Sequence, residues 1–199
     1  MDSSTTLTEG SEIPLWIQLS RAHEDYTSDT SEHYDEVLEE VTERFAKTGS
    51  LGKADIGSLL LWKRLRADTK WAKKLMNTPD LEVREATENV LKYANDELLS
   101  VPEAAEKSRS ALGALPGFTT GDALASAVIV AAAPKRMAIY DRRAHHGLTL
   151  LGIQLANSRG RYRRYMQEVE VLIQLLDEHD QTWTAREIDQ ALFALGNQR

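Results

Sequence analysis

Apolar residues recur every three or four positions along most of the chain, which is the spacing of amphipathic helices. The clearest example is the span 161–178, where the apolar positions are Tyr162, Tyr165, Met166, Val169, Leu172, Ile173 and Leu176. No stretch alternates apolar and polar residues for long enough to indicate a strand. The pattern therefore predicts an all-α protein.

Start and stop signals divide this pattern into further helices. The predicted spans are 32–47, 53–66, 79–94, 101–112, 122–133, 142–155 and 184–196. Ser100 and Thr184 each precede a glutamate by three residues, which is the spacing of a capping box. Gly49 stands where a helix C-terminus favours a left-handed residue, and Pro134 ends the span 122–133 because it cannot donate a backbone hydrogen bond.

The first 31 residues differ from the rest in composition. Residues 1–12 are rich in Ser, Thr, Asp and Glu, and no helical pattern precedes residue 32. The sequence therefore predicts an acidic, partly disordered segment over 1–31 and a single helical domain over 32–199. The overall composition, 42% hydrophobic and 28% charged in 199 residues, is that of a globular protein.

Cysteine and the apolar runs limit the possible chemistry and location. The chain contains no cysteine, which excludes disulfides, thiolate nucleophiles and cysteine-held iron–sulfur clusters. The N-terminus lacks the basic and apolar parts of a signal peptide, and the longest apolar run, 123–133, is too short to span a bilayer. We expect a cytoplasmic protein without membrane contact.

The formal charge of −7 is unevenly distributed. The first fifty residues hold twelve acidic and three basic side chains, so they carry −9 and the remainder carries +2. Within 135–164, eight basic residues accompany a single acid, Asp141, and a second basic run spans 63–74. Many such runs are solvated helix faces, but two runs flanking one motif favour an anionic partner.

The stretch 115–146 carries the candidate chemistry. A Leu-Pro-Gly turn ending at Gly117 leads through Gly121 into the apolar span 122–133, and Asp141 follows among basic and histidine residues. Glycines let a backbone approach a phosphate closely, and the next helix presents free amides and its positive dipole end. This order predicts a phosphate-binding helical hairpin over 101–133 with a carboxylate beyond it; an αα-hairpin without a ligand is the alternative.

These motifs resemble the helix-hairpin-helix (HhH-GPD) superfamily of DNA glycosylases. The resemblance rests on Leu115-Pro116-Gly117, Ala125-Ser126-Ala127, Pro134 and Ile139-Tyr140-Asp141-Arg142-Arg143-Ala144. Within this superfamily the chain is most similar to bacterial 8-oxoguanine-DNA-glycosylase-like members. The resemblance in the arrangement of helices covers roughly residues 51–196. It implies a two-lobed helical fold with the hairpin beside a base-accepting cleft, in a protein associated with the nucleoid.

The resemblance implies that the protein binds duplex DNA and releases a damaged base that is rotated out of the duplex. Asp141 matches the catalytic carboxylate that stabilises the developing charge on the sugar. Relatives that also cleave the strand use a lysine in the second hairpin helix, and 118–134 contains none, so the implied enzyme is a monofunctional N-glycosylase without a cofactor. The expected DNA contacts are Lys63, Gly117, Phe118, Thr119, Thr120, Gly121, Arg142, Arg143, His145, Arg163 and Arg164.

Departures from the usual hairpin keep two other classes open. The loop between the glycines is two residues longer, which together with the missing lysine is compatible with a non-catalytic DNA-binding relative. Asp122 would repel a phosphate at the helix end, and with the acidic region 24–43 it would suit a helical protein-interaction domain that no longer binds DNA. His145 and His146 lack a second ligand cluster, so no metal site is predicted.

The glycosylase hypothesis makes a geometric demand on Asp141. The carboxylate has to face an open cleft beside the loop 117–121. An Asp141 tied up in an ion pair and closed off from solvent, with no groove nearby, would contradict the hypothesis. The lesion, the oligomeric state and the order of residues 1–31 cannot be predicted from the sequence.

Overall fold

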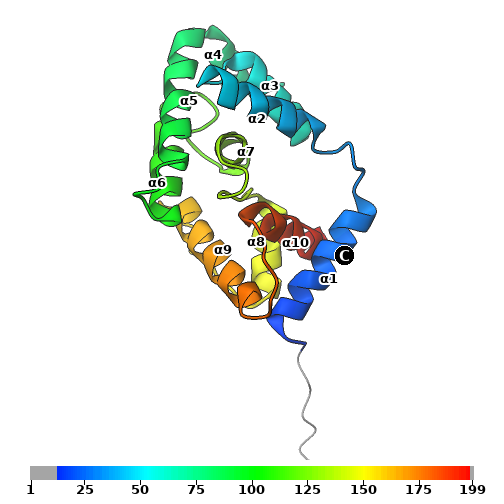
Figure 1. Ribbon diagram of the computed structural model, residues 1–199. Helices are drawn as coiled ribbons and strands as arrows, with labels where there is room; N and C mark the ends of the chain where they lie inside the picture. Colours follow the sequence, from blue (N-terminus) through cyan, green and yellow to red (C-terminus); the bar gives the residue numbers. More distant parts are fainter. Residues whose placement is uncertain (1–12, 198–199) are drawn as a thin grey trace, which may run out of the picture.

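A computed structural model describes residues 13–197, which form ten α-helices and no strand and so confirm the all-α class. The helices are α1 (Leu15–Asp29), α2 (Glu36–Thr48), α3 (Lys53–Trp62), α4 (Lys70–Asn77), α5 (Asp80–Ala94), α6 (Val101–Ala111), α7 (Ala123–Ala132), α8 (Arg142–Leu150), α9 (Arg161–Asp177) and α10 (Ala185–Asn197). Figure 1 shows the other helices arranged around α7. No helix in the described part of the chain is long and apolar enough to cross a membrane.

Most predicted helices are present, with two additions. The sequence predicts no helix before residue 32, but α1 occupies much of the predicted N-terminal segment and packs on α10. Only Leu19 and Ala22 of α1 are buried, so its apolar stripe is too short to predict a helix from the sequence. The helix α4 lies within a basic run and has a single buried apolar residue, Leu75, so no apolar spacing marks it in the sequence. The predicted disorder of residues 1–12 lies outside the described residues.

The capping signals act largely as predicted. Ser100 forms a capping box with Glu103 at the start of α6, and Gly49 ends α2 in the left-handed conformation. The Thr184 hydroxyl accepts from the Glu187 backbone N–H, while the Glu187 carboxylate accepts from the Thr184 backbone N–H. The predicted helix ending at residue 66 stops at Trp62 instead, because the chain turns left-handed two residues later.

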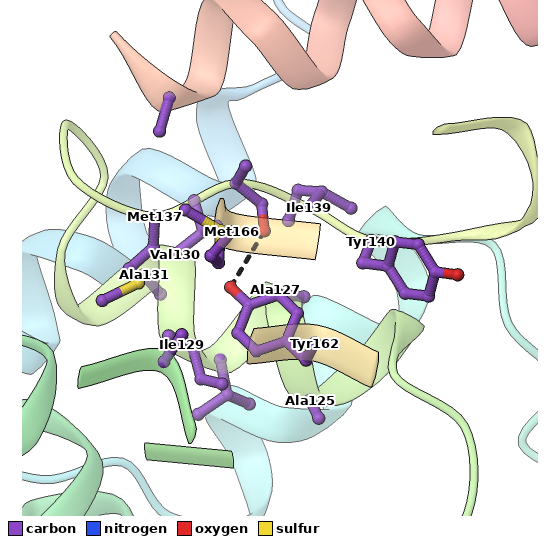
Figure 2. Close-up of a cluster of buried hydrophobic side chains, with 14 of the residues drawn as sticks. Ala125, Ala127, Ile129, Val130, Ala131, Met137, Ile139, Tyr140, Tyr162 and Met166 are labelled. Carbon is purple, nitrogen blue, oxygen red and sulfur yellow. Dashed lines mark hydrogen bonds between the residues drawn. The ribbon is translucent and has the colours of Figure 1, made fainter. Parts of the chain in front are cut away.

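Helix α7 is the centre of the core. Every residue from Leu124 to Ala132 is buried, and α7 contacts α2, α3, α5 and α6. A helix that is apolar on all sides has to be enclosed by other elements. Figure 2 shows its side chains against Tyr162 and Met166, which come from α9.

An extended segment, 137–140, connects the core to the next helix, and all four of its side chains are buried. Its backbone polar groups are satisfied by side chains, as buried irregular backbone requires. The Ile139 N–H donates to Asp189 (2.7 Å) and the Tyr140 N–H to Ser126 Oγ (3.0 Å). Tyr162 donates its hydroxyl to the Ala138 carbonyl (3.0 Å), and this bond is the dashed line in Figure 2. The segment therefore fixes the position of the residue that follows it, Asp141.

Helices α8 and α10 approach closely because two glycines lie at their contact. A Cβ on Gly147 would lie 2.2 Å from the Leu192 carbonyl oxygen, and one on Gly196 would lie 1.9 Å from the Arg143 carbonyl oxygen. These close approaches leave no space for a side chain. They also bring Phe193 of α10 beside Arg143 of α8, with 4.7 Å between the guanidinium carbon and the ring centroid.

Candidate functional site

A cleft opens between α1, α3, α8 and α10. Its outer part is a hollow of about 660 Å³ beside α1, and a second hollow of about 300 Å³ lies over Asp141. Tyr34, Arg64, Arg143 and Phe193 line both hollows. A narrow inner part reaches down between aromatic side chains and is lined by Asp141 as well. We refer to the three connected hollows as the Asp141 cleft.

Asp141 lies at the base of this cleft, where it begins α8. Its Oδ1 accepts hydrogen bonds from the backbone N–H groups of Arg143 (2.9 Å) and Ala144 (3.0 Å), which makes it the N-cap of the helix. Its Oδ2 accepts from Lys63 Nζ at 2.7 Å. The Asp141 side chain keeps 16% exposure, so the carboxylate is tied up in an ion pair but still reaches solvent.

The environment of Asp141 keeps it ionised. Burial raises the pKa of the carboxyl, but the Lys63 ammonium and the two α8 amides favour the charged form more strongly and hold the pKa below its usual value. A fixed negative charge at the base of an aromatic cleft is suited to stabilise a positive charge that develops nearby.

Lys63, predicted as a DNA contact, lies beside Asp141 and is 10% exposed. It comes from the end of α3, 78 residues earlier in the chain, and its Nζ also lies 5.4 Å from the centroid of the Trp62 ring. Ala123, the first residue of α7, lines the same hollow. The hairpin helix lacks a lysine, but α3 places an amine at the predicted catalytic carboxylate.

Aromatic side chains form the walls of the Asp141 cleft. Tyr26 and Phe193 meet edge to face with centroids 6.0 Å apart, and Tyr34 is tilted against Trp62 at 6.0 Å. Burial raises the pKa of Tyr26 to about 12, so its hydroxyl stays protonated and can donate a hydrogen bond. Sequence reasoning did not identify Tyr26, Tyr34 or Phe193 as site residues, because they come from α1, the turn before α2 and α10, and no local motif marks them.

A buried charge network holds the base of the cleft together. Arg186 of α10 donates to both carboxylate oxygens of Asp35 and is ion-paired with Asp189, while Trp62 Nε1 donates to Asp35 at 3.2 Å. Complete burial raises the pKa of Asp189 to about 6, although Arg186 opposes the shift. The network joins the start of α2, the end of α3 and α10, which are the elements that surround the inner part of the cleft.

Two residues of the predicted phosphate-binding loop, Gly117 and Phe118, have packing roles. Gly117 has φ +92°, and a Cβ there would lie 2.2 Å from the Trp71 ring, so this glycine serves the packing of Trp71 of α4. The side chain of Phe118 is fully buried and offers no surface to a ligand. Thr119, Thr120 and Gly121 are exposed, and the space around Gly121 is open.

Four arginines beside this loop, Arg109, Arg161, Arg163 and Arg164, have partners within the protein. Asp122 does not cap α7 with its side chain; it accepts from Arg109 at 2.8 Å and from Arg161 at 2.7 Å. Arg163 pairs with Glu106 at 2.8 Å. The Arg164 guanidinium donates to three backbone carbonyls of residues 156–159, so it stabilises the turn before α9. We refer to these residues and the 670 Å³ hollow that most of them line as the hairpin hollow.

The remaining predicted contacts lie on α8. Arg142 and Arg143 are exposed, and both line the hollow over Asp141. His145 is half-buried, and its Nδ1 lies 3.0 Å from the Tyr140 hydroxyl. The structure therefore brings Lys63, Asp141, Arg142 and Arg143 to one cleft, whereas the loop 117–121, Arg163 and Arg164 lie on the hairpin side.

The geometric demand on Asp141 is met in part. The carboxylate is ion-paired, yet it opens onto a cleft, and the hairpin residue that lines this cleft is Ala123 and not the loop 117–121. Comparison with known proteins adds no constraint: no family, no curated protein and no solved structure matches the chain.

Proposed function

We propose that the protein is a DNA-binding, base-excision N-glycosylase with Asp141 as its catalytic residue. The observation that supports this most is the position of Asp141: an ionised carboxylate, fixed by two helix amides, at the base of a cleft with aromatic walls and basic side chains at its mouth. Aromatic walls bind a planar base, and the basic side chains suit the phosphates beside it.

The proposed reaction uses the cleft as follows. A nucleotide rotated out of the duplex places its sugar over Asp141. The bond between C1′ and the base nitrogen breaks, and the electron pair leaves with the base. The carboxylate stabilises the positive charge that develops on the sugar ring. Water then adds its oxygen to C1′, and the proton it loses ends on the released base.

The proposal includes the two-lobed architecture that the resemblance implies. One group of contacting helices is α1, α8, α9 and α10, a second surrounds α7 with α2, α3, α5 and α6, and the contact between α6 and α9 joins the two groups. The Asp141 cleft lies where α1 and α10 face the end of α3. The exposed loop residues Thr119, Thr120 and Gly121 would contribute contacts to the DNA backbone from the second group.

The position of Lys63 supports a second candidate, a glycosylase that uses the Lys63 amine as its nucleophile and also cleaves the strand. The Nζ of Lys63 lies 2.7 Å from Asp141 and lines the cleft, so the ammonium can pass a proton to this carboxylate and the resulting amine can attack C1′ in place of water. The enzyme would then hold the sugar as a Schiff base and could cleave the strand. Borohydride reduction of the protein with duplex containing an abasic site distinguishes the two forms, because only the amine form yields a covalent adduct that is lost in Lys63→Met.

Base release from duplexes that each carry one modified base tests the proposal. We expect the wild-type protein to release at least one base in single-turnover assays, and Asp141→Asn to slow release at least about a hundredfold, since the amide keeps the helix cap but carries no charge. Arg66→Gln, which removes an exposed surface ion pair to Asp68, is the matched control and should release the base at the wild-type rate. Release that is unchanged in Asp141→Asn would remove this residue from the mechanism.

The two alternative classes give different results in the same experiment. A non-catalytic DNA-binding relative would bind duplex in a salt-dependent manner and release no base from any modified duplex. A protein-interaction domain would show no duplex affinity even at low salt. Either result would contradict the proposed activity.

A further inference from the structure

Arg64 adopts a backbone conformation that is costly for an arginine. It follows α3 with φ +51°, in the left-handed region, and the Leu65 N–H donates to the Leu60 carbonyl (3.0 Å) while the Arg64 N–H donates to the Leu61 carbonyl (2.8 Å). This hydrogen-bond pattern is the Schellman motif, whose left-handed position is usually glycine because a Cβ is strained there. Strained residues of this kind concentrate at binding and catalytic sites.

The turn aims the Arg64 side chain at the cleft. Its guanidinium carbon lies 5.9 Å from the centroid of the Tyr34 ring, and Arg64 lines both the outer hollow and the hollow over Asp141. Arg143 lines the same two hollows and stacks on Phe193. Within residues 13–197, neither guanidinium has a carboxylate within 4.0 Å or a hydrogen-bond acceptor.

We infer that the Asp141 cleft binds one nucleotide, with its phosphate held by Arg64 and Arg143 and its base stacked among the aromatic walls. The inference deepens the proposed function by assigning the phosphate site of the cleft, and it rests on that proposal only for the claim that the nucleotide belongs to a DNA strand. Two guanidinium groups, each held on an aromatic ring and without an acidic partner, are suited to bind a phosphate.

The charges around the cleft determine on which side the phosphate of the nucleotide binds and on which side its base binds. The acidic side chains of the outer hollow, Asp25 and Asp29, come from α1, whereas Lys63, Arg142 and Asp141 lie on the side of the two arginines. A phosphate therefore binds at Arg64 and Arg143, and the base extends toward Tyr26, which lines the outer hollow. At the inner end, Arg186 is paired with Asp35 and Asp189 and the hollow narrows to about 20 Å³, so the base stays in the outer part of the cleft.

The left-handed conformation of Arg64 provides a sharp test, because glycine should fit the turn at least as well. Arg64→Gly should melt at or above the wild-type temperature and bind a nucleotide at least about fivefold more weakly. Arg143→Gln should show the same weakening. The matched control is Asp180→Gly. Asp180 follows α9 with φ +58°, and the Gln181 N–H donates to the Leu176 carbonyl as in the Arg64 turn. Asp180 lines none of the hollows of the Asp141 cleft. This variant should also melt at or above the wild-type temperature but bind as the wild type does.

The measurement is isothermal titration calorimetry of the full-length protein with deoxyadenosine 5′-monophosphate, deoxyadenosine, inorganic phosphate and a short single-stranded oligonucleotide. We expect the monophosphate to bind at least about tenfold more tightly than the nucleoside. If only the oligonucleotide binds, the nucleotide is recognised as part of a strand, and Arg64→Gly should weaken that binding instead. Arg64→Gly that binds every probe as tightly as the wild type, or no binding of any nucleotide probe, would overturn the inference.

The outcomes separate this inference from the proposed function. Nucleotide binding that depends on Arg64, without base release from any duplex, would contradict the glycosylase proposal alone. Base release that proceeds at the wild-type rate in Arg64→Gly, at DNA concentrations below saturation, would contradict the phosphate site alone.

Discussion

The outer hollow of the Asp141 cleft, about 660 Å³, and the hairpin hollow, about 670 Å³, are similar in volume and both are lined by arginines, but most of these arginines differ in their partners. In the hairpin hollow, Arg109 and Arg161 share Asp122, and Arg163 pairs with Glu106. In the cleft, Arg64 and Arg143 contact aromatic rings and no acid among the described residues. A guanidinium that already has a carboxylate partner is largely neutralised, so it attracts a phosphate less strongly.

A basic run in the sequence therefore does not show which of its side chains are available for binding in the folded protein. The sequence gives equal weight to Arg143, Arg163 and Arg164, because all three belong to one run. In the folded chain, Arg164 binds backbone carbonyls and Arg163 an acid, while Arg143 remains accessible at the cleft. We therefore propose that ligand binding takes place chiefly in the cleft and that most of the hairpin arginines have structural roles.

The largest effect on stability should come from the centre of the hairpin hollow. Asp122 is 9% exposed, and Asp122→Ala leaves the partly buried Arg109 and Arg161 without a carboxylate partner. We expect the free energy of unfolding to fall by about 4 kcal/mol in urea denaturation, the usual cost of breaking a buried ion pair on one side. A change below about 1 kcal/mol would show that these arginines are not held by Asp122, and the contrast with the cleft would fail.

The two glycines of the loop should differ in their response to a methyl group. Gly117→Ala meets the Trp71 ring and also needs a positive φ, so we expect a loss of about 3 kcal/mol. Gly121→Ala needs a positive φ but has open space, so its loss should be about 1 kcal/mol. Thermal unfolding of both variants measures the difference, and equal losses would contradict a packing role for Gly117.

The charge network at the base of the cleft predicts a dependence of stability on pH. Because the pKa of Asp189 is raised to about 6 in the folded protein, the fold binds this proton more tightly than the unfolded chain does. The stabilising contribution is complete below about pH 4 and is lost as the pH rises to about 6, by roughly 2 kcal/mol. Asp189→Asn should remove this part of the pH profile. A wild-type profile that lacks a fall between pH 4 and 6, or one that Asp189→Asn leaves unchanged, would contradict the raised pKa.

The smallest effect should come from the exposed pair Arg163 and Glu106. Both side chains are close to half exposed, so solvent screens their attraction. Glu106→Gln should change the free energy of unfolding by less than about 1 kcal/mol, while freeing Arg163 to bind DNA. Duplex affinity that rises in Glu106→Gln would support the view that pairing limits the hairpin arginines, and affinity that falls would contradict it.

The fold class, most helices and the position of Asp141 could be predicted from sequence because they depend on local signals. Apolar spacing marks α9, and Pro134 and the capping boxes mark helix ends. The helix cap that Asp141 forms is also a local feature, since its cap partners are two and three residues away.

The partners of the site residues could not be predicted, because they are set by long-range packing. Lys63 and Asp141 are 78 residues apart, and Arg186 and Asp35 are 151 residues apart. Gly117 illustrates the same limit: a glycine after proline suggests a ligand-binding turn, but Trp71, 46 positions earlier in the chain, determines its role. The aromatic walls were missed because α1 has a short apolar stripe and its C-terminal partner α10 meets it only in the folded chain.

The salt dependence of binding to duplex that contains an abasic-site analogue distinguishes the Asp141 cleft from the hairpin hollow. We expect the cleft to carry the principal phosphate contacts. Each phosphate contact contributes about 0.9 to the slope of log affinity against log salt concentration. We predict that Arg143→Gln reduces the slope by about one contact and that Arg163→Gln leaves it unchanged. A slope that falls in Arg163→Gln and is unaffected in Arg143→Gln would contradict the account.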